Sequence, residues 1–155
     1  MPNIYRFFLS QRIELVFLIL LTSLFVLPTL ISNVIATLLS VDNWTMVDLA
    51  YTNTLFNTIA ILIKAPILET FIYQFLPYMF LKKILKLKAF YIILLSATIF
   101  AGVHFYNYIY IIYAFFAGCI LMFAYIVFTK RKFYPFLTLV IIHFTVNLIA
   151  YLAYL

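Results

Sequence analysis

The stretch from Ala65 to Gln74, A-P-I-L-E-T-F-I-Y-Q, places a carboxylate in the middle of an apolar segment. The chain has four acidic residues, and Glu69 is the one with apolar sequence on both sides. An ionisable group at membrane depth is costly, about 2.5–3.5 kcal/mol for the comparable Asp, so it is by default a functional-site hypothesis. The alternative is a protonated Glu69 that bonds a neighbouring helix as a packing group.

The composition around this stretch is that of a membrane protein. Of 155 residues, 68% are hydrophobic and 9% are charged, whereas soluble domains carry about 25% charged residues. We therefore expect a polytopic bundle of membrane helices forming one domain over 1–155. Within it, 1–53 hold an N-terminal helix and a connection, and 54–155 hold the motifs described below. The single cysteine, Cys119, excludes an internal disulfide and a cysteine-rich metal site.

Long segments without formal charge predict the spans. Leu15–Val41 exceeds the roughly 20 residues that cross a bilayer. It is also too long for the apolar part of a signal peptide, so we predict a retained span with a kink near Pro28. Ala89–Thr129 is long enough for two spans with a turn at Tyr106–Tyr108. Phe133–Leu155 is the last span.

The segment around Glu69 leaves two alternatives. One tilted and kinked span could run from about Thr54 to Leu81. Otherwise Lys64 marks the membrane surface, the span runs from Ala65 to about Lys83, and 46–63 form an interfacial or re-entrant helix.

The basic residues outnumber the acidic ones by ten to four and cluster at the ends of apolar segments. In a membrane protein this is a topology signal, so we expect membrane lipid and no nucleic acid as a partner. Five spans with the N-terminus inside and the C-terminus outside place every basic turn on one side. The inside segments are then 1–14, 82–88 and 130–132, and the outside segments are 42–53 and 106–108.

Further polar groups lie in or at the ends of the predicted spans. His104 ends the third span, and His143 and Asn147 share one face of the fifth, four residues apart. Gly102, just before His104, predicts a close approach of another helix. Each group alone serves equally well as an interhelical packing contact. On three different spans, Glu69 and these groups predict a common polar cavity, since each would otherwise need its own partner.

Such a cavity favours hydrolysis by an activated water. Glu69 and His104 could activate the water, while His143 and Asn147 could donate hydrogen bonds to a developing oxyanion. Zinc held by Glu69, His104 and His143 is the alternative. Because the chain contains no H-E-x-x-H, a zinc site would have to be assembled from separate helices, so we favour the metal-free mechanism and keep zinc as the possible cofactor.

The order and spacing of these residues resemble the CPBP family of CAAX proteases and bacteriocin-processing enzymes, also called the Abi family. The family pattern is E-E-x-x-x-R, F-x-x-x-H and H-x-x-x-N on successive membrane helices. The chain has E69-T-F-I-Y-Q74, Phe100 with His104, and His143 with Asn147. The resemblance covers about 65–150. It implies an intramembrane protease in which Glu69 and His104 activate water and His143 and Asn147 stabilise the oxyanion or, in older interpretations, bind metal.

The first motif departs from the family pattern at two positions. Thr70 stands in place of the second Glu and Gln74 in place of the Arg. The two changes leave the local net charge unaltered, and we expect Thr70 and Gln74 to hydrogen-bond each other at i,i+4.

Three functions compete at this point. The first is an intramembrane endopeptidase acting on a membrane-associated protein or peptide, with or without a lipid modification. The second is a non-catalytic relative that serves in bacteriocin immunity or as a protein scaffold. The third, a small transporter or proton relay, rests only on intramembrane Glu and His. Size and family resemblance indicate a bacterial plasma membrane.

Overall fold

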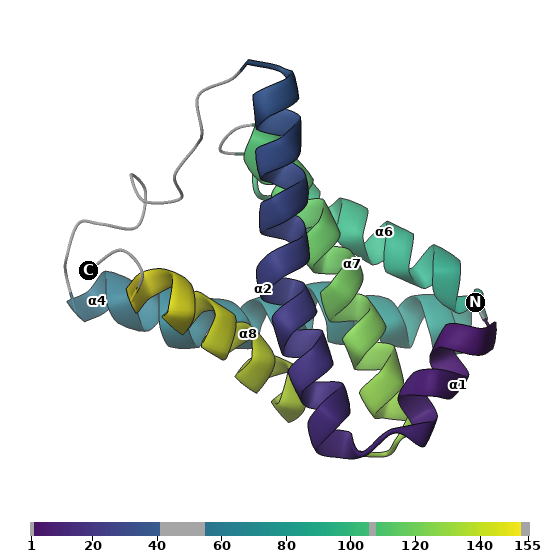
Figure 1. The fold of residues 1–155 in the computed structure, drawn as a ribbon. Helices are drawn as coiled ribbons and strands as arrows, with labels where there is room; N and C mark the ends of the chain where they lie inside the picture. Colours follow the sequence, from purple (N-terminus) through teal and green to yellow (C-terminus); the bar gives the residue numbers. More distant parts are fainter. Residues whose placement is uncertain (1, 41–54, 106–107, 153–155) are drawn as a thin grey trace.

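A computed structural model describes residues 2–40, 55–105 and 108–152, and within them every regular element is a helix. The predicted all-helical membrane bundle is therefore confirmed. The elements run along the chain as a short helix α1, a long helix α2, one continuous helix over residues 55–84, and three further helices (Figure 1). Their bounds are α1 Pro2–Ser10, α2 Ile13–Leu38, Leu55–Ile84, α6 Ala89–Gly102, α7 Tyr108–Lys130 and α8 Pro135–Leu152.

Four of these helices have the length and hydropathy to cross a membrane: α2, Leu55–Ile84, α7 and α8. The third predicted span corresponds to α6, which is apolar but has only 14 residues. At 1.5 Å per residue it covers about 21 Å, less than the roughly 30 Å of a hydrocarbon core. The orientation with the N-terminus inside stays a prediction. The predicted connection 42–53 and the turn residues 106–107 lie outside the described residues.

The helix that carries Glu69 is continuous from Leu55 to Ile84, in agreement with the single-span alternative. We call it the wide helix, because it alternates between α-helical and π-helical turns. Its segments are α4 Leu55–Ile59, η1 Ala60–Lys64, α5 Ala65–Glu69, η2 Thr70–Phe75 and η3 Tyr78–Ile84. A π-helical turn bonds each N–H to the carbonyl five residues back, and such turns are frequent at functional sites.

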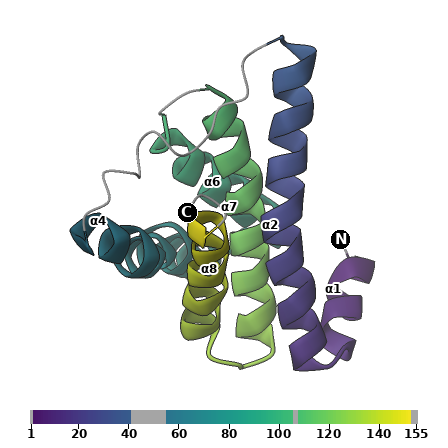
Figure 2. The same cartoon turned by 60° about the vertical axis from the view of Figure 1, so that its left-hand side comes forward.

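Helix α7 is the centre of the apolar core. It lies side by side with α2 in both views, and the wide helix crosses them (Figures 1 and 2). Helix α2 presents a buried stripe at every fourth residue, which is the spacing of one helix face. The stripe consists of Val16, Leu20, Leu24, Pro28, Ser32 and Ala36.

The close approach predicted at Gly102 occurs elsewhere. Among the described residues, a Cβ at Gly102 would meet nothing within 4 Å, so the prediction for that residue was wrong. At Gly118 of α7, an added Cβ would lie 3.0 Å from the Cα of Ala97 and 3.1 Å from the Phe100 ring. Gly118 therefore lets α6 pack tightly on α7, and this contact fixes the helix that ends next to His104.

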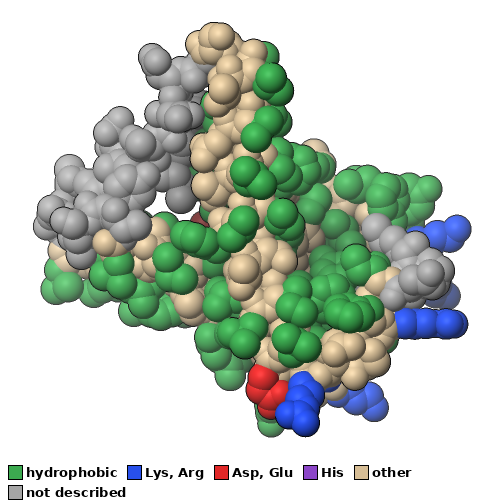
Figure 3. Space-filling view, viewed as in Figure 1, with side chains coloured by type: hydrophobic (Ala, Val, Ile, Leu, Met, Phe, Trp, Pro, Cys, Tyr) green, Lys and Arg blue, Asp and Glu red, His purple; other side chains and the backbone are tan. Residues whose placement is uncertain are grey.

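The basic turn after α7 has a structural contact that the charge pattern did not indicate. Arg131 donates from Nη1 to the carbonyl of Phe8 at 2.6 Å and from Nη2 to the carbonyl of Gln11 at 2.8 Å. The Phe8 ring packs edge-on against Phe123 of α7. These contacts hold α1 against the bundle. The space-filling view shows hydrophobic side chains over most of the surface, with Lys and Arg at its lower and right-hand edges (Figure 3).

Candidate active site

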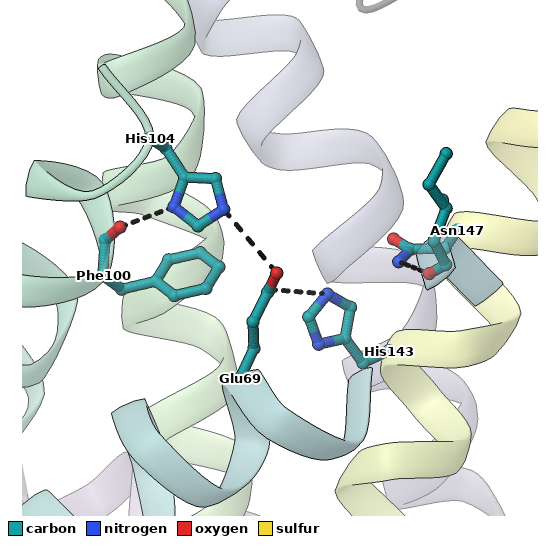
Figure 4. Close-up of polar contacts among 6 residues, drawn as sticks. Glu69, Phe100, His104, His143 and Asn147 are labelled. Carbon is teal, nitrogen blue, oxygen red and sulfur yellow. Dashed lines mark hydrogen bonds and ion pairs between the residues drawn. The ribbon is translucent and has the colours of Figure 1, made fainter. Parts of the chain in front are cut away.

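The carboxylate of Glu69 lies between two imidazole rings (Figure 4). His104 Nε2 is 3.9 Å from Glu69 Oε1, and His143 Nε2 is 3.6 Å from Glu69 Oε2. The three side chains come from the middle of the wide helix, from the turn after α6 and from the middle of α8. Their side chains are 23%, 13% and 10% exposed, respectively. The predicted convergence of these three groups is therefore present in the structure.

His104 is oriented by its own backbone neighbourhood. Its Nδ1 is 2.6 Å from the carbonyl oxygen of Phe100, one turn earlier. A carbonyl can only accept, so Nδ1 carries the proton in this contact, and in the neutral ring Nε2 is then an acceptor. The ring also packs against the Phe100 ring, with 4.4 Å between centroids. His104 thus presents a basic nitrogen toward Glu69.

His143 is held differently. It is buried on α8, and its Nδ1 has no hydrogen-bond partner among the described residues. Its other nitrogen, Nε2, faces Glu69 Oε2. With the proton on Nε2, this ring can donate a hydrogen bond toward the space beside the carboxylate.

The side chain of Asn147 is not hydrogen-bonded to Glu69 or to either histidine in the described part of the chain. Its Nδ2 donates instead to the backbone carbonyl of Ile61 in η1, at 3.1 Å (Figure 4). One turn further along α8, the hydroxyl of Tyr151 lies 3.2 Å from that of Thr58. The face of α8 that carries His143 therefore continues as a row of polar contacts to the wide helix.

Thr70 and Gln74 are both completely buried. Thr70 Oγ1 and both amide atoms of Gln74 have no hydrogen-bond partner in the described part of the chain. The predicted bond between them is therefore wrong. An i,i+4 spacing places both residues on one helix face, but it does not fix the side-chain rotamers that decide whether their polar atoms meet.

Three more residues lie around the candidate site. Phe100 was predicted from the sequence, whereas Tyr73 and Ser96 were not. The buried Phe100 ring packs edge-on against Tyr73, with 5.4 Å between centroids. The backbone carbonyl of Tyr73 accepts a hydrogen bond from the Ser96 hydroxyl on α6. The sequence carries no signal for the Ser96 contact, because the residues before Pro77 are π-helical and Pro77 is then opposite the carbonyl of Ile72 and not that of Tyr73.

Zinc held by Glu69, His104 and His143 stays a prediction. Over residues 2–40, 55–105 and 108–152, no three His, Cys, Asp or Glu side chains are grouped as a metal site in this arrangement. What the three side chains offer is a carboxylate base, an imidazole acceptor and an imidazole donor around one point. Such a set suits the activation of a water molecule and the stabilisation of negative charge.

Comparison with known proteins agrees with the resemblance drawn from the motifs. The family model described as type II CAAX prenyl endopeptidase Rce1-like matches residues 50–149, a range that contains Glu69, both histidines and Asn147. Neither the curated proteins nor the solved structures gave a match.

Proposed function

The chain belongs to the Rce1-like family of type II CAAX prenyl endopeptidases, and from that premise we propose that it is an intramembrane endopeptidase. Its substrate would be a membrane-associated protein or peptide with a lipid-modified C-terminal region, and its location the plasma membrane of a bacterium. The observation that carries the proposal is the position of two imidazole Nε2 atoms beside two different oxygens of one carboxylate.

The proposed reaction needs only these side chains and a water molecule. Glu69 takes a proton from the water while His104 Nε2 accepts the second O–H and orients it. The oxygen of the water forms a bond to the scissile carbonyl carbon, and His143 donates from Nε2 to the resulting oxyanion. Glu69 then returns the proton to the amide nitrogen as the C–N bond breaks and the oxyanion reforms a carbonyl, so the products are a carboxylic acid and an amine, between which a proton transfer gives the carboxylate and the ammonium.

The test is cleavage of a farnesylated CAAX-type peptide by the purified protein in lipid nanodiscs. Glu69→Gln keeps the shape of the side chain but is not a base, so kcat/KM should fall by about 10³-fold or more. Glu14→Gln is the matched control, because Glu14 is an exposed carboxylate in the first turn of α2 and should retain parental activity. Equal rates for the parent and Glu69→Gln would refute the mechanism.

A second candidate is a non-catalytic membrane protein that acts in bacteriocin immunity or as a scaffold. The observation in its favour is the pair Thr70 and Gln74, which stand where the family pattern has Glu and Arg and which are buried without recorded partners. The same assay separates the two functions. A parent protein that cleaves no faster than Glu69→Gln supports the non-catalytic function.

A further inference from the structure

Two prolines interrupt the hydrogen bonding of the wide helix, because proline has no backbone N–H. In an α-helical register Pro66 would leave the carbonyl of Leu62 without a partner, and in a π-helical register that of Ile61. Residues 60–64 are π-helical, and the N–H of Ala65 bonds the carbonyl of Ala60, five residues back. Continuing this register by one residue, the acceptor that Pro66 leaves unbonded is Ile61.

A side chain from a neighbouring helix bonds the carbonyl opposite Pro66, since the Ile61 carbonyl accepts from Asn147 Nδ2 at 3.1 Å. A second side-chain bond to the wide helix lies beyond Glu69, where the Tyr73 carbonyl accepts from the buried hydroxyl of Ser96. This second carbonyl is not the one opposite Pro77, because the N–H of Leu76 bonds the carbonyl of Phe71, five residues back, and the same register pairs Pro77 with Ile72. Water is scarce at membrane depth, so a carbonyl freed there needs a partner within the protein.

The two contacts lie on either side of Glu69 along the wide helix. Asn147 is on α8, one turn from His143. Ser96 is on α6, which leads one turn later to Phe100 and then to His104. Each contact therefore joins the helix of the carboxylate to the helix that places one of its two imidazole partners.

We propose that Asn147 and Ser96 are positioning residues. Asn147 bonds the backbone carbonyl freed by Pro66, Ser96 bonds the backbone carbonyl of Tyr73, and the two bonds hold Glu69 in register with His143 and His104. Asn147 then acts on the geometry of the site and not on the reacting atoms. The effect of Asn147 on catalysis rests on the proposed endopeptidase function, whereas its hydrogen bond to the Ile61 carbonyl does not.

The decisive experiment restores the missing N–H. Asn147→Leu removes the donor at nearly constant size, and kcat for the farnesylated peptide should fall by up to about 10²-fold with KM little changed, since a misplacement of about 1 Å has that effect. Pro66→Ala returns an N–H that can bond the Ile61 carbonyl from within the helix. The double variant Pro66→Ala/Asn147→Leu should recover to within about threefold of Pro66→Ala alone, because the two changes act on one acceptor.

The crossed combination is the control. Pro77→Ala/Asn147→Leu restores an N–H at the wrong turn and should stay as slow as Asn147→Leu. Ser96→Ala should also lower kcat, and Pro66→Ala should not restore it, because the Tyr73 carbonyl is not the acceptor opposite Pro66. If Pro66→Ala gives no recovery in Asn147→Leu, Asn147 acts directly on the reacting groups and the proposal is wrong.

A measurement without substrate separates this inference from the proposed function. The thermal unfolding midpoint of each variant is measured in the same detergent micelles. Asn147→Leu should lower Tm when residue 66 is proline and much less when it is alanine. Equal Tm losses in both backgrounds overturn the bonding assignment, whether or not the parent cleaves peptide.

Discussion

Helix α7 and the wide helix are both long enough to cross a membrane, but they differ in how much of each is buried inside the protein. In the most hydrophobic part of α7, 56% of the residues are buried inside the protein, against 11% in the wide helix. Yet Glu69 is on the wide helix, and the bonds from Asn147 and Ser96 reach its backbone. Helix α7 is held by close packing spread over many atoms, whereas the wide helix is held at its carboxylate by a few directional contacts.

Because of this difference, we expect substitutions in the two helices to affect different properties of the protein. A change in α7 acts on packing, so its main effect should be on unfolding. A change near Glu69 that removes one polar group without adding a charge should act mainly on catalysis, whereas an added charge there should also lower stability. Substitutions in the two regions can show whether the separation holds.

The largest effect is expected from a charge at Thr70. Thr70→Glu places a second carboxylate on the buried face of the wide helix, and an uncompensated buried charge lowers stability by about 3–5 kcal/mol. Adding Gln74→Arg supplies the cation of the family pattern and should restore at least half of the lost stability. Chemical unfolding of the parent, both single variants and the double variant measures this coupling. Independent, additive losses would mean that the two positions do not face each other.

His104→Asn should lower kcat/KM by about 10²-fold. The amide nitrogen of Asn can take the place of Nδ1 and keep the bond to the Phe100 carbonyl, but nothing replaces Nε2 beside Glu69. The unfolding temperature should therefore stay close to that of the parent. His104→Ala, which loses both contacts, should be as inactive and less stable. Parental activity in His104→Asn would contradict a role for Nε2.

The smallest effect is expected at the apolar contact between α6 and α7. Gly118→Ala brings a Cβ to 3.0 Å from the Cα of Ala97, and such overpacking costs about 1–3 kcal/mol. Gly102→Ala is the matched control, because nothing lies within 4 Å of its added Cβ. Thermal unfolding should separate the two variants. A larger loss in Gly102→Ala would show that the packing of α6 has been misassigned.

The family and the fold class were predictable from sequence for different reasons. Uncharged segments such as Leu15–Val41 indicate membrane helices because the cost of burying a charge in lipid is a property of each residue. The three motifs predicted a site at Glu69, His104 and His143 because family members keep these residues at characteristic separations. The packing of α1 against the bundle was not predictable. It depends on bonds from Arg131, which in the sequence is only one residue of a basic turn.

Within the candidate site, errors arose where a prediction rested on spacing along the chain alone. Thr70 and Gln74 were expected to bond each other at i,i+4, but their buried polar atoms do not. Gly102 was expected at a helix contact that Gly118 makes instead. Both errors have one cause, because side-chain rotamers and helix packing depend on neighbouring helices that a local pattern does not contain.

The amino-acid sequence by itself determined that the chain forms membrane helices and which side chains could do chemistry in them. Hydrophobicity and side-chain type are local quantities, so they are readable without coordinates. The tertiary structure decided which of those side chains meet. It brought the two histidines to the two oxygens of Glu69 and directed Asn147 to the Ile61 carbonyl instead. The physical reason is that a carbonyl freed by proline needs a donor, and only the packing of α8 against the wide helix settles which side chain supplies it.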